Sequence, residues 1–361
     1  MMIEAELIVS APGRMCLFGE HQDYFGLAII AAAVNLRITI SGRRRPDRRI
    51  HLDLPDIGQT EDMDLDRPIL YDKPRDYLKS GVNVLRRQGV ELRSGWDCLV
   101  QGTIPINAGA ASSSALCVAW LKFLLEAAAD ARADEPDALA ELAFQTEVAE
   151  FKEPGGKMDH YSSARGHVVS IHFGEEFRLR ALPNPLGSFV LANSLEKKDT
   201  TGMLGFIKGN VLQAAESVRR TIPGFTLRGP LGAETEKAIQ ALSSPDQRRL
   251  LKGTLLTRNL TAEGEALFGQ NDFNHVRFGQ LLSAQHGVLR DYLQTSTPKI
   301  ERMIQAALEA GALGAKINGS GGGGTMFAYA PGDVERVARA VEGQGARVDV
   351  VRTDDGIRRE R

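Results

Sequence analysis

Residues 11–24 read APGRMCLFGEHQDY and combine a turn-forming start with apolar and ionisable side chains. The preceding residues, 6–10, are predicted to form a strand that ends at the Pro12-Gly13 turn. The apolar run Met15–Phe18 is flanked by four side chains that can ionise or form hydrogen bonds: Arg14, Glu20, His21 and Asp23. Polar groups gathered around an apolar run predict a site for a polar ligand, and a salt-bridged turn is the alternative.

A second segment, residues 105–115, reads PINAGAASSSA and leads directly into a predicted helix over 112–131. The N-terminus of a helix offers N–H groups without partners and a partial positive charge, which together attract phosphate. Small residues let a phosphate group approach, and serine hydroxyls can bind phosphate or Mg²⁺. Ordinary N-capping by one of the serines is the alternative.

A third segment, residues 319–324, reads GSGGGG and satisfies the G-x-G-x-x-G pattern. A strand rather than a helix is predicted after it, so it is not a dinucleotide-binding fingerprint. The other motifs of protein kinases are absent from the chain. The backbone of such a loop can approach an anion closely, and a flexible turn is the alternative.

Two carboxylates, Glu147 and Asp159, lie on either side of the Pro154-Gly155-Gly156 break, which ends a predicted helix over 139–151. A turn at this break can bring them to one site, where one carboxylate binds a metal and the other a substrate hydroxyl. Solvated surface carboxylates are the alternative.

Composition excludes several classes of protein. The chain has 361 residues, 43% of them apolar, and a net charge of −2, which predicts a globular protein without a general field for nucleic acid or anionic lipid. The basic run Arg43–Arg49 is predicted to be a solvated turn before the returning arm of a hairpin. Cys16, Cys98 and Cys117 form no disulfide framework, so we expect free thiols, a reducing compartment and a cytoplasmic location. No segment has the pattern of a membrane span or a signal peptide.

The pattern of elements changes near residue 180. The residues before this point alternate strands and helices, including a helix over 76–87, whereas residues up to 310 are mainly helical. Strands and a glycine loop return after residue 310. The sequence therefore predicts an N-terminal domain over 1–180 and a C-terminal domain over 181–361.

Taken together, these segments resemble the GHMP small-molecule kinases, and within that family the galactokinases. Residues 11–24 are similar to the signature A-P-G-R-x-x-x-x-G-E-H-x-D-Y, residues 105–115 to the phosphate loop P-x-G-x-G-L-x-S-S-A, and residues 316–324 to the third family motif. Residues 156–160, GKMDH, resemble G-I-M-D-Q. The resemblance implies a two-domain α+β fold with the active site in the cleft between the domains.

The resemblance also implies roles for individual residues. Asp159 would be the catalytic carboxylate and Arg14 its cationic partner. Ser113 and Glu147 would bind Mg²⁺, with Ser112 and Glu150 as alternatives. The sugar would contact Glu20, His21, Asp23 and Gly156. ATP would lie on Gly109, Ala110, Ala111, Ser112, Ser113, Ser114, Gly321 and Gly322.

Some residues depart from the galactokinase pattern. Cys16 replaces an asparagine, Asn107 and two alanines alter the phosphate loop, and Lys157 stands where isoleucine is usual. Residues 193–200, together with the four-glycine run, are more similar to mevalonate kinases. We therefore predict an ATP-dependent kinase that phosphorylates a monosaccharide hydroxyl, the anomeric one being expected. The alternatives are a kinase for an N-acetylhexosamine or uronic acid, a mevalonate-type kinase, and a non-catalytic ATP and sugar sensor.

Overall fold

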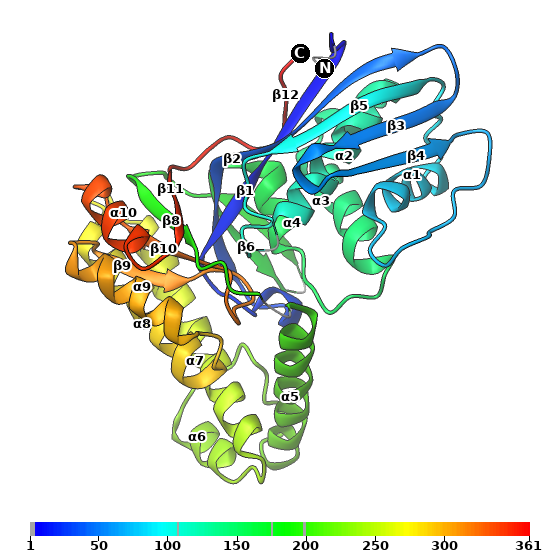
Figure 1. Ribbon diagram of the computed structural model, residues 1–361. Helices are drawn as coiled ribbons and strands as arrows, with labels where there is room; N and C mark the ends of the chain where they lie inside the picture. Colours follow the sequence, from blue (N-terminus) through cyan, green and yellow to red (C-terminus); the bar gives the residue numbers. More distant parts are fainter. Residues whose placement is uncertain (1–3, 107, 175, 198–199) are drawn as a thin grey trace.

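The computed structural model describes residues 4–106, 108–174, 176–197 and 200–361, and its strands form two sheets (Figure 1). The first sheet has the strand order β12-β1-β2-β5-β3-β4, with β6 beside β2 and β7 beside β6. Its strands are β1 (Leu7–Phe18), β2 (Ile29–Arg45), β3 (Arg49–Leu54), β4 (Gln59–Asp64), β5 (Gly95–Gly102), β6 (Val168–Phe173), β7 (Phe177–Ala181) and β12 (Arg358–Arg359). The mixture of sheets and helices confirms the expected α+β fold.

Strand β1 does not end at the Pro12-Gly13 turn, as the sequence predicts, but continues to Phe18. The pairing with β2 shifts register between Pro12 and Gly13, and a proline is tolerated in a strand at such an irregularity. Gly13 is required there, because a Cβ atom at this position would lie 2.7 Å from the carbonyl oxygen of Ala110. The continuation carries Arg14 into the interior of the molecule.

The predicted hairpin after the basic run is wrong in its pairing. β5 lies between β2 and β3, antiparallel to β2 and parallel to β3, so β3 forms its hairpin with β4 instead. The turn itself is solvated, and Arg45 pairs with Asp47 and Asp97. A parallel partner that lies 46 residues further along the chain, as Trp96 does from Ile50, leaves no local signal in the sequence.

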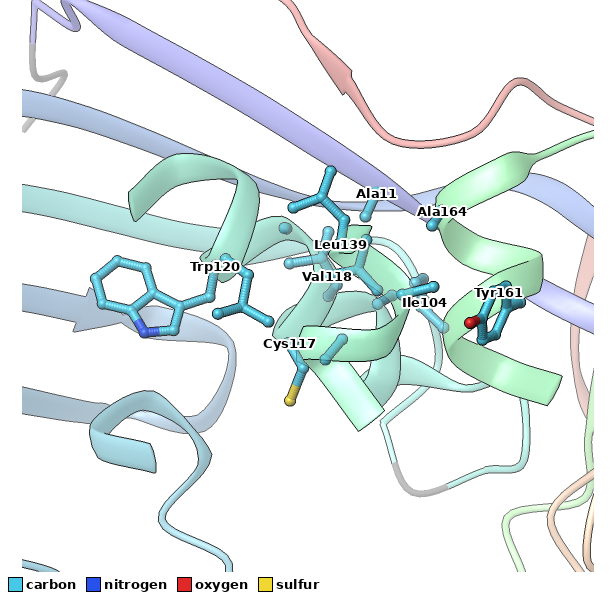
Figure 2. Close-up of a cluster of buried hydrophobic side chains, with 14 of the residues drawn as sticks. Ala11, Ile104, Cys117, Val118, Trp120, Leu139, Tyr161 and Ala164 are labelled. Carbon is cyan, nitrogen blue, oxygen red and sulfur yellow. The ribbon is translucent and has the colours of Figure 1, made fainter. Parts of the chain in front are cut away.

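Helices cover one face of the first sheet. They are α1 (Tyr77–Arg87), α2 (Ser112–Ala128), α3 (Pro136–Phe144) and α4 (Met158–Arg165), with short helical turns at Asp23–Phe25, Pro55–Ile57 and Ala131–Asp134. α2 and α4 pack on β1 and β2, and α3 packs on both helices. Figure 2 shows this core, where Val118 of α2 and Leu139 of α3 lie near Ala11 of β1.

The second sheet has the order β11-β8-β10-β9 and is antiparallel throughout. Its strands are β8 (Phe189–Asn193), β9 (Gly314–Ile317), β10 (Thr325–Tyr329) and β11 (Arg347–Val351). Its helices are α5 (Thr200–Thr221), α6 (Ala233–Gln240), α7 (Pro245–Phe268), α8 (His275–Val288), α9 (Pro298–Glu309) and α10 (Val334–Glu342), with a π-helical turn at Leu289–Leu293. α8, α9 and α10 contact this sheet, whereas α5 and α6 project away from it (Figure 1).

Elements from the second half of the chain contact the first sheet at two places. α7 contacts β1 and β2, and β12 returns from the second half to pair with Val9 and Ser10 of β1. The boundary at residue 180 stays a prediction, but the last strand belongs to the sheet of the first half.

Cys16, Cys98 and Cys117 are buried free thiols. Within the described part of the chain, no helix combines the length and the apolar content that a membrane crossing requires. The cytoplasmic location and the lack of a nucleic-acid partner stay predictions.

Candidate active site

One pocket brings the three sequence motifs together. Its lining includes the predicted residues Arg14, Glu20, His21, Asp23, Gly109, Ala111, Ser112, Ser113, Ser114, Glu147, Gly156 and Asp159. These residues come from β1, the turn after it, the N-terminus of α2, the π-helical turn Gln145–Ala149, the segment before α4 and α4 itself. Segments that are distant in sequence thus meet at one site.

Arg14 and Asp159 form an ion pair in the pocket. The Nε of Arg14 donates to Oδ1 of Asp159 at 2.8 Å, and Nη2 lies 2.8 Å from the same oxygen. Nη1 donates to the carbonyl oxygen of Gly109 at 2.7 Å. Burial alone would lower the pKa of Arg14, but the Asp159 carboxylate outweighs it and raises that pKa. None of the described residues donates a hydrogen bond to Oδ2 of Asp159.

Asp23 lies where the first motif meets the turn before α4. Its Oδ2 accepts a hydrogen bond from the backbone N–H of Met158 at 3.1 Å. Burial raises the pKa of Asp23, and this hydrogen bond opposes the rise. A Cβ atom at Gly156 would lie 2.0 Å from Oδ2 of Asp23, so only glycine leaves room for the carboxylate.

Glu20 and His21 both contact the third motif. Glu20 is buried and forms an ion pair with Lys316 of β9, which is also buried. The Nε2 of His21 lies 3.2 Å from the carbonyl oxygen of Ser320, and its Nδ1 lies 2.7 Å from the hydroxyl of Tyr24. Glu20 and His21, two of the predicted sugar-binding residues, are therefore held by the third motif.

The serines occupy the first turn of α2, and none of them is its N-cap, so the alternative of ordinary N-capping is wrong. The N-cap is Ala111, with a φ of 62° in the left-handed region and no side chain that can cap. The side chains of Ser113 and Ser114 instead help to lower the pKa of Glu147. The first turn of α2 therefore presents hydroxyls as well as N–H groups to the pocket.

Glu147 lies in a π-helical turn, Gln145–Ala149, which interrupts the helix predicted over 139–151. Its Oε2 lies 2.8 Å from Nε2 of His160. Burial would raise the pKa of Glu147, but the contacts with His160 and the serine hydroxyls outweigh it and lower that pKa. Glu150, the alternative ligand, contacts Tyr71 and Arg87 and does not line the pocket.

The donor set at Glu147 fits Mg²⁺. A carboxylate beside serine hydroxyls offers the hard oxygen ligands that this ion prefers, and Mg²⁺ usually takes few protein ligands together with phosphate and water oxygens. Ser113 and Glu147 are the residues that would hold the ion.

Three of the residues predicted to bind ATP do not line the pocket, and two of them belong to the glycine loop. Gly319 and Ser320 line the pocket, whereas Ala110, Gly321 and Gly322 do not. The N–H of Gly322 donates to the carbonyl oxygen of Thr295 at 2.7 Å, so this amide is taken by the protein itself. The positive φ values of Gly321 and Gly322, 79° and 75°, explain why glycine stands there.

Asn318 was not singled out by the sequence, yet it joins all three motifs. Its Oδ1 accepts from the N–H of Cys16 at 2.9 Å, and its Nδ2 donates to the carbonyl oxygen of Gly109 at 3.0 Å. The N–H of Thr325 donates to the carbonyl oxygen of Ala108 at 2.6 Å. In the sequence, its position directly before the glycine run is the signal of this role.

Several further residues line the pocket without having been predicted, among them Arg75, Tyr77, Glu153, His160, Thr200 and Leu204. Arg75 pairs with Glu153 and has a φ of 58°. Lys157 pairs with Glu141 at 2.7 Å and does not line the pocket. The predicted departures at Asn107, Lys198 and Asp199 lie outside the described residues.

Comparison with known proteins assigns these segments to one family. Residues 76–167 match the family described as GHMP kinases N terminal domain, and residues 266–347 match GHMP kinases C terminal. Residues 3–44 match the galactokinase galactose-binding signature.

Curated relatives cover nearly the whole chain. A galactokinase of Actinobacillus succinogenes is 26% identical over 93% of this chain and 88% of its own. A mevalonate kinase of Thermococcus onnurineus is 27% identical over 98% of both chains.

Solved structures share the fold. A galactokinase from Lactococcus lactis in complex with galactose superposes with a TM-score of 0.85 at 23% identity, over 98% of this chain and 95% of its own. A mevalonate kinase from Methanococcus jannaschii superposes with a TM-score of 0.72 at 18% identity, over 96% of this chain and 98% of its own. The chain belongs to the GHMP family of ATP-dependent small-molecule kinases and carries the galactokinase signature in its first sheet.

Proposed function

We propose that this protein is a sugar kinase that transfers the γ-phosphoryl group of ATP to a monosaccharide hydroxyl, the anomeric one. The observation that carries the proposal is the charge of the pocket. Five carboxylates line it, and the two arginines among the described lining residues are already paired, Arg14 with Asp159 and Arg75 with Glu153. A neutral, hydroxyl-rich substrate donates hydrogen bonds to such carboxylates, whereas an anionic substrate finds no unpaired arginine among the described lining residues.

Asp159 and Arg14 supply the groups that the transfer requires. Asp159 accepts the proton of the acceptor hydroxyl through Oδ2, while its Oδ1 stays on Arg14. Arg14 keeps the carboxylate in position and stabilises negative charge on the transferring group. Since phosphoryl transfer depends mainly on positioning and charge neutralisation, this pair accounts for much of the chemistry.

The nucleotide phosphates would lie at the first turn of α2, where N–H groups and the helix dipole attract them. Ser113 and Glu147 would hold Mg²⁺, which supplies neutralisation of phosphate charge when it is bound. Gly319 and Ser320 line the same pocket.

A mevalonate-type kinase is the second candidate, because relatives of that activity match the chain about as well as galactokinases do. Mevalonate carries a carboxylate, which the acidic lining would repel. A non-catalytic sensor is the third candidate, and the intact Arg14–Asp159 pair argues against it.

A coupled assay of ADP release tests the proposal directly. The assay uses a panel of neutral hexoses and pentoses, N-acetylhexosamines, uronic acids and mevalonate. We expect turnover with a neutral sugar and an acid-labile product, as an anomeric phosphate is. Turnover with mevalonate alone would refute the sugar kinase, and binding of sugar without ADP release would indicate a sensor.

A further inference from the structure

Lys316 is the most completely enclosed charged side chain near the pocket. The residue has no exposed surface, and it lies on β9, only three positions before Gly319. Its Nζ donates to the carbonyl oxygens of Cys16 at 2.9 Å and Ile317 at 3.1 Å, and to Oε1 of Glu20. An ammonium group has three N–H donors, so all three are used and none is left for a ligand.

Glu20, in contrast to Lys316, has one polar atom without a hydrogen-bond partner. Its Oε1 is taken by Lys316, whereas its Oε2 is buried without any hydrogen-bond partner. Glu20 lines the pocket, and a buried carboxylate oxygen without a donor is costly. One oxygen of this pocket-lining carboxylate is thus without a donor, while the other is held by Lys316.

We propose that Lys316 is a positioning residue that orients Glu20 so that its carboxylate accepts one, and only one, hydroxyl of the sugar. This inference rests on the proposed sugar-kinase function. Lys316 acts through Glu20 and touches no substrate itself. The enzyme then discriminates against the deoxy sugar that lacks this one hydroxyl, because that analogue leaves Oε2 unpaired.

An ion pair with a purely structural role would behave differently. Removing Lys316 from such a pair would destabilise the protein, but it would not raise the KM for the sugar more than the KM for ATP. In the proposed arrangement, loss of the ammonium frees the Glu20 carboxylate to leave its position, so the sugar site loses its acceptor while the phosphate site at α2 keeps its own groups.

The first experiment compares Lys316→Met with Lys122→Met. Lys122 is also buried and paired with carboxylates, Glu126 and Asp134, but it does not line the pocket. We expect Lys316→Met to raise the KM for the sugar about 10- to 100-fold with little change in the KM for ATP. Lys122→Met should change neither KM. If the wild type phosphorylates a sugar and folded Lys316→Met has an unchanged KM for it, the inference about Lys316 is overturned, whereas the proposed function is not.

A double-mutant cycle with Glu20→Gln separates positioning from general disruption. Because Lys316 acts only through Glu20, the effect of Lys316→Met on the sugar KM should nearly vanish in the Glu20→Gln background. Full additivity of the two effects overturns the inference.

A panel of monodeoxy sugars needs no lysine variant, so it serves where Lys316→Met does not fold. The wild type should lose about 10- to 100-fold in kcat/KM against one analogue, and Glu20→Gln should lose this selectivity. If Glu20→Gln abolishes discrimination against two different deoxy analogues, both carboxylate oxygens accept a hydroxyl, and the inference is overturned. A wild type that phosphorylates no sugar overturns the proposed function and this inference with it.

Discussion

The Arg14–Asp159 pair concentrates the chemistry in two side chains. Replacing Asp159 with Asn should lower kcat by about a hundredfold to ten-thousandfold, because the amide cannot accept the proton of the acceptor hydroxyl. The Kd for ATP should stay nearly unchanged, since Asp159 does not belong to the phosphate site. Steady-state kinetics and calorimetry measure the two quantities.

Asp137→Asn is the matched control, because Asp137 forms an exposed pair with Arg165. The melting temperature is recorded for both variants, since Arg14 loses its counter-ion. A kcat of Asp159→Asn within threefold of the wild type would remove Asp159 from the mechanism.

The contact between Gly156 and Asp23 gives a second prediction. In Gly156→Ala, the added methyl group would displace the Asp23 carboxylate, so the KM for the sugar should rise at least about tenfold while the KM for ATP stays the same. Gly155→Ala is the control, because a Cβ atom there meets Val148 at an ordinary 3.5 Å. Equal sugar KM values in the two variants would contradict the role of Asp23.

The raised pKa of Asp23 implies that its charge lowers stability. The folded state binds the proton more tightly than the unfolded state, so stability falls as the pH rises from the ordinary carboxyl range through the raised pKa. Above the raised pKa the ionised group is present at full cost. Asp23→Asn should therefore melt at a higher temperature than the wild type at pH 7, and this difference should shrink at acid pH. If Asp23→Asn melts at a lower temperature than the wild type at pH 7, the ionised Asp23 does not destabilise the folded protein.

At the scale of elements, the π-helical turn Gln145–Ala149 decides which carboxylate faces the site. One extra residue in the turn changes the phase of the helix, so Glu147 meets the serines of α2 while Glu150 meets Arg87. Glu147→Gln should raise the Mg²⁺ concentration needed for half-maximal activity, whereas Glu150→Gln should not. A Mg²⁺ titration at saturating sugar distinguishes them, and identical curves for both variants would place the ion elsewhere.

The elements show what the sequence could predict and what it could not. Helix α1 and the boundary of the glycine loop follow from local patterns of apolar residues and glycines. The π turn has no such pattern, because its residues also fit a regular helix. The insertion of β5 between β2 and β3 depends on a partner distant in sequence, so the local pattern of residues 43–54 suggested a hairpin that does not form.

The same distinction applies to the site. The resemblance of residues 11–24 and 156–160 to family motifs was sufficient to single out Arg14 and Asp159, and the structure pairs them. Lys316 and Asn318 were missed because their partners lie about 300 residues away. A lysine inside the short apolar strand β9 is a signal of a buried partner, but it does not identify Glu20.

At the scale of the whole molecule, Arg37 ties the end of the chain to the first sheet. Its guanidinium donates to Ser10, Asp354 and the carbonyl oxygen of Gly356, at 2.7, 2.7 and 2.8 Å. Arg37→Met should lower the free energy of unfolding by about 2–3 kcal/mol, because several charge-assisted hydrogen bonds are lost together. Denaturant unfolding measures this change.

Arg43→Met is the control for this variant, because the side chain of Arg43 is 56% exposed in its pair with Asp97. Its unfolding free energy should change by no more than about 0.5 kcal/mol. A loss of equal size in both variants would show that Arg37 contributes no more than a surface arginine.

The pairing of β12 with β1 also bears on how the protein is made. Synthesis proceeds from the N-terminus, so β1 leaves the ribosome long before Arg358 and Arg359 exist to cover its outer edge. During that interval the N–H and C=O groups of Val9 and Ser10 lie on an open strand edge, which can pair with another chain. The nascent first sheet is therefore exposed to aggregation until Arg358 and Arg359 have been translated, and binding of chaperones should concentrate on nascent chains that have not yet reached residue 358.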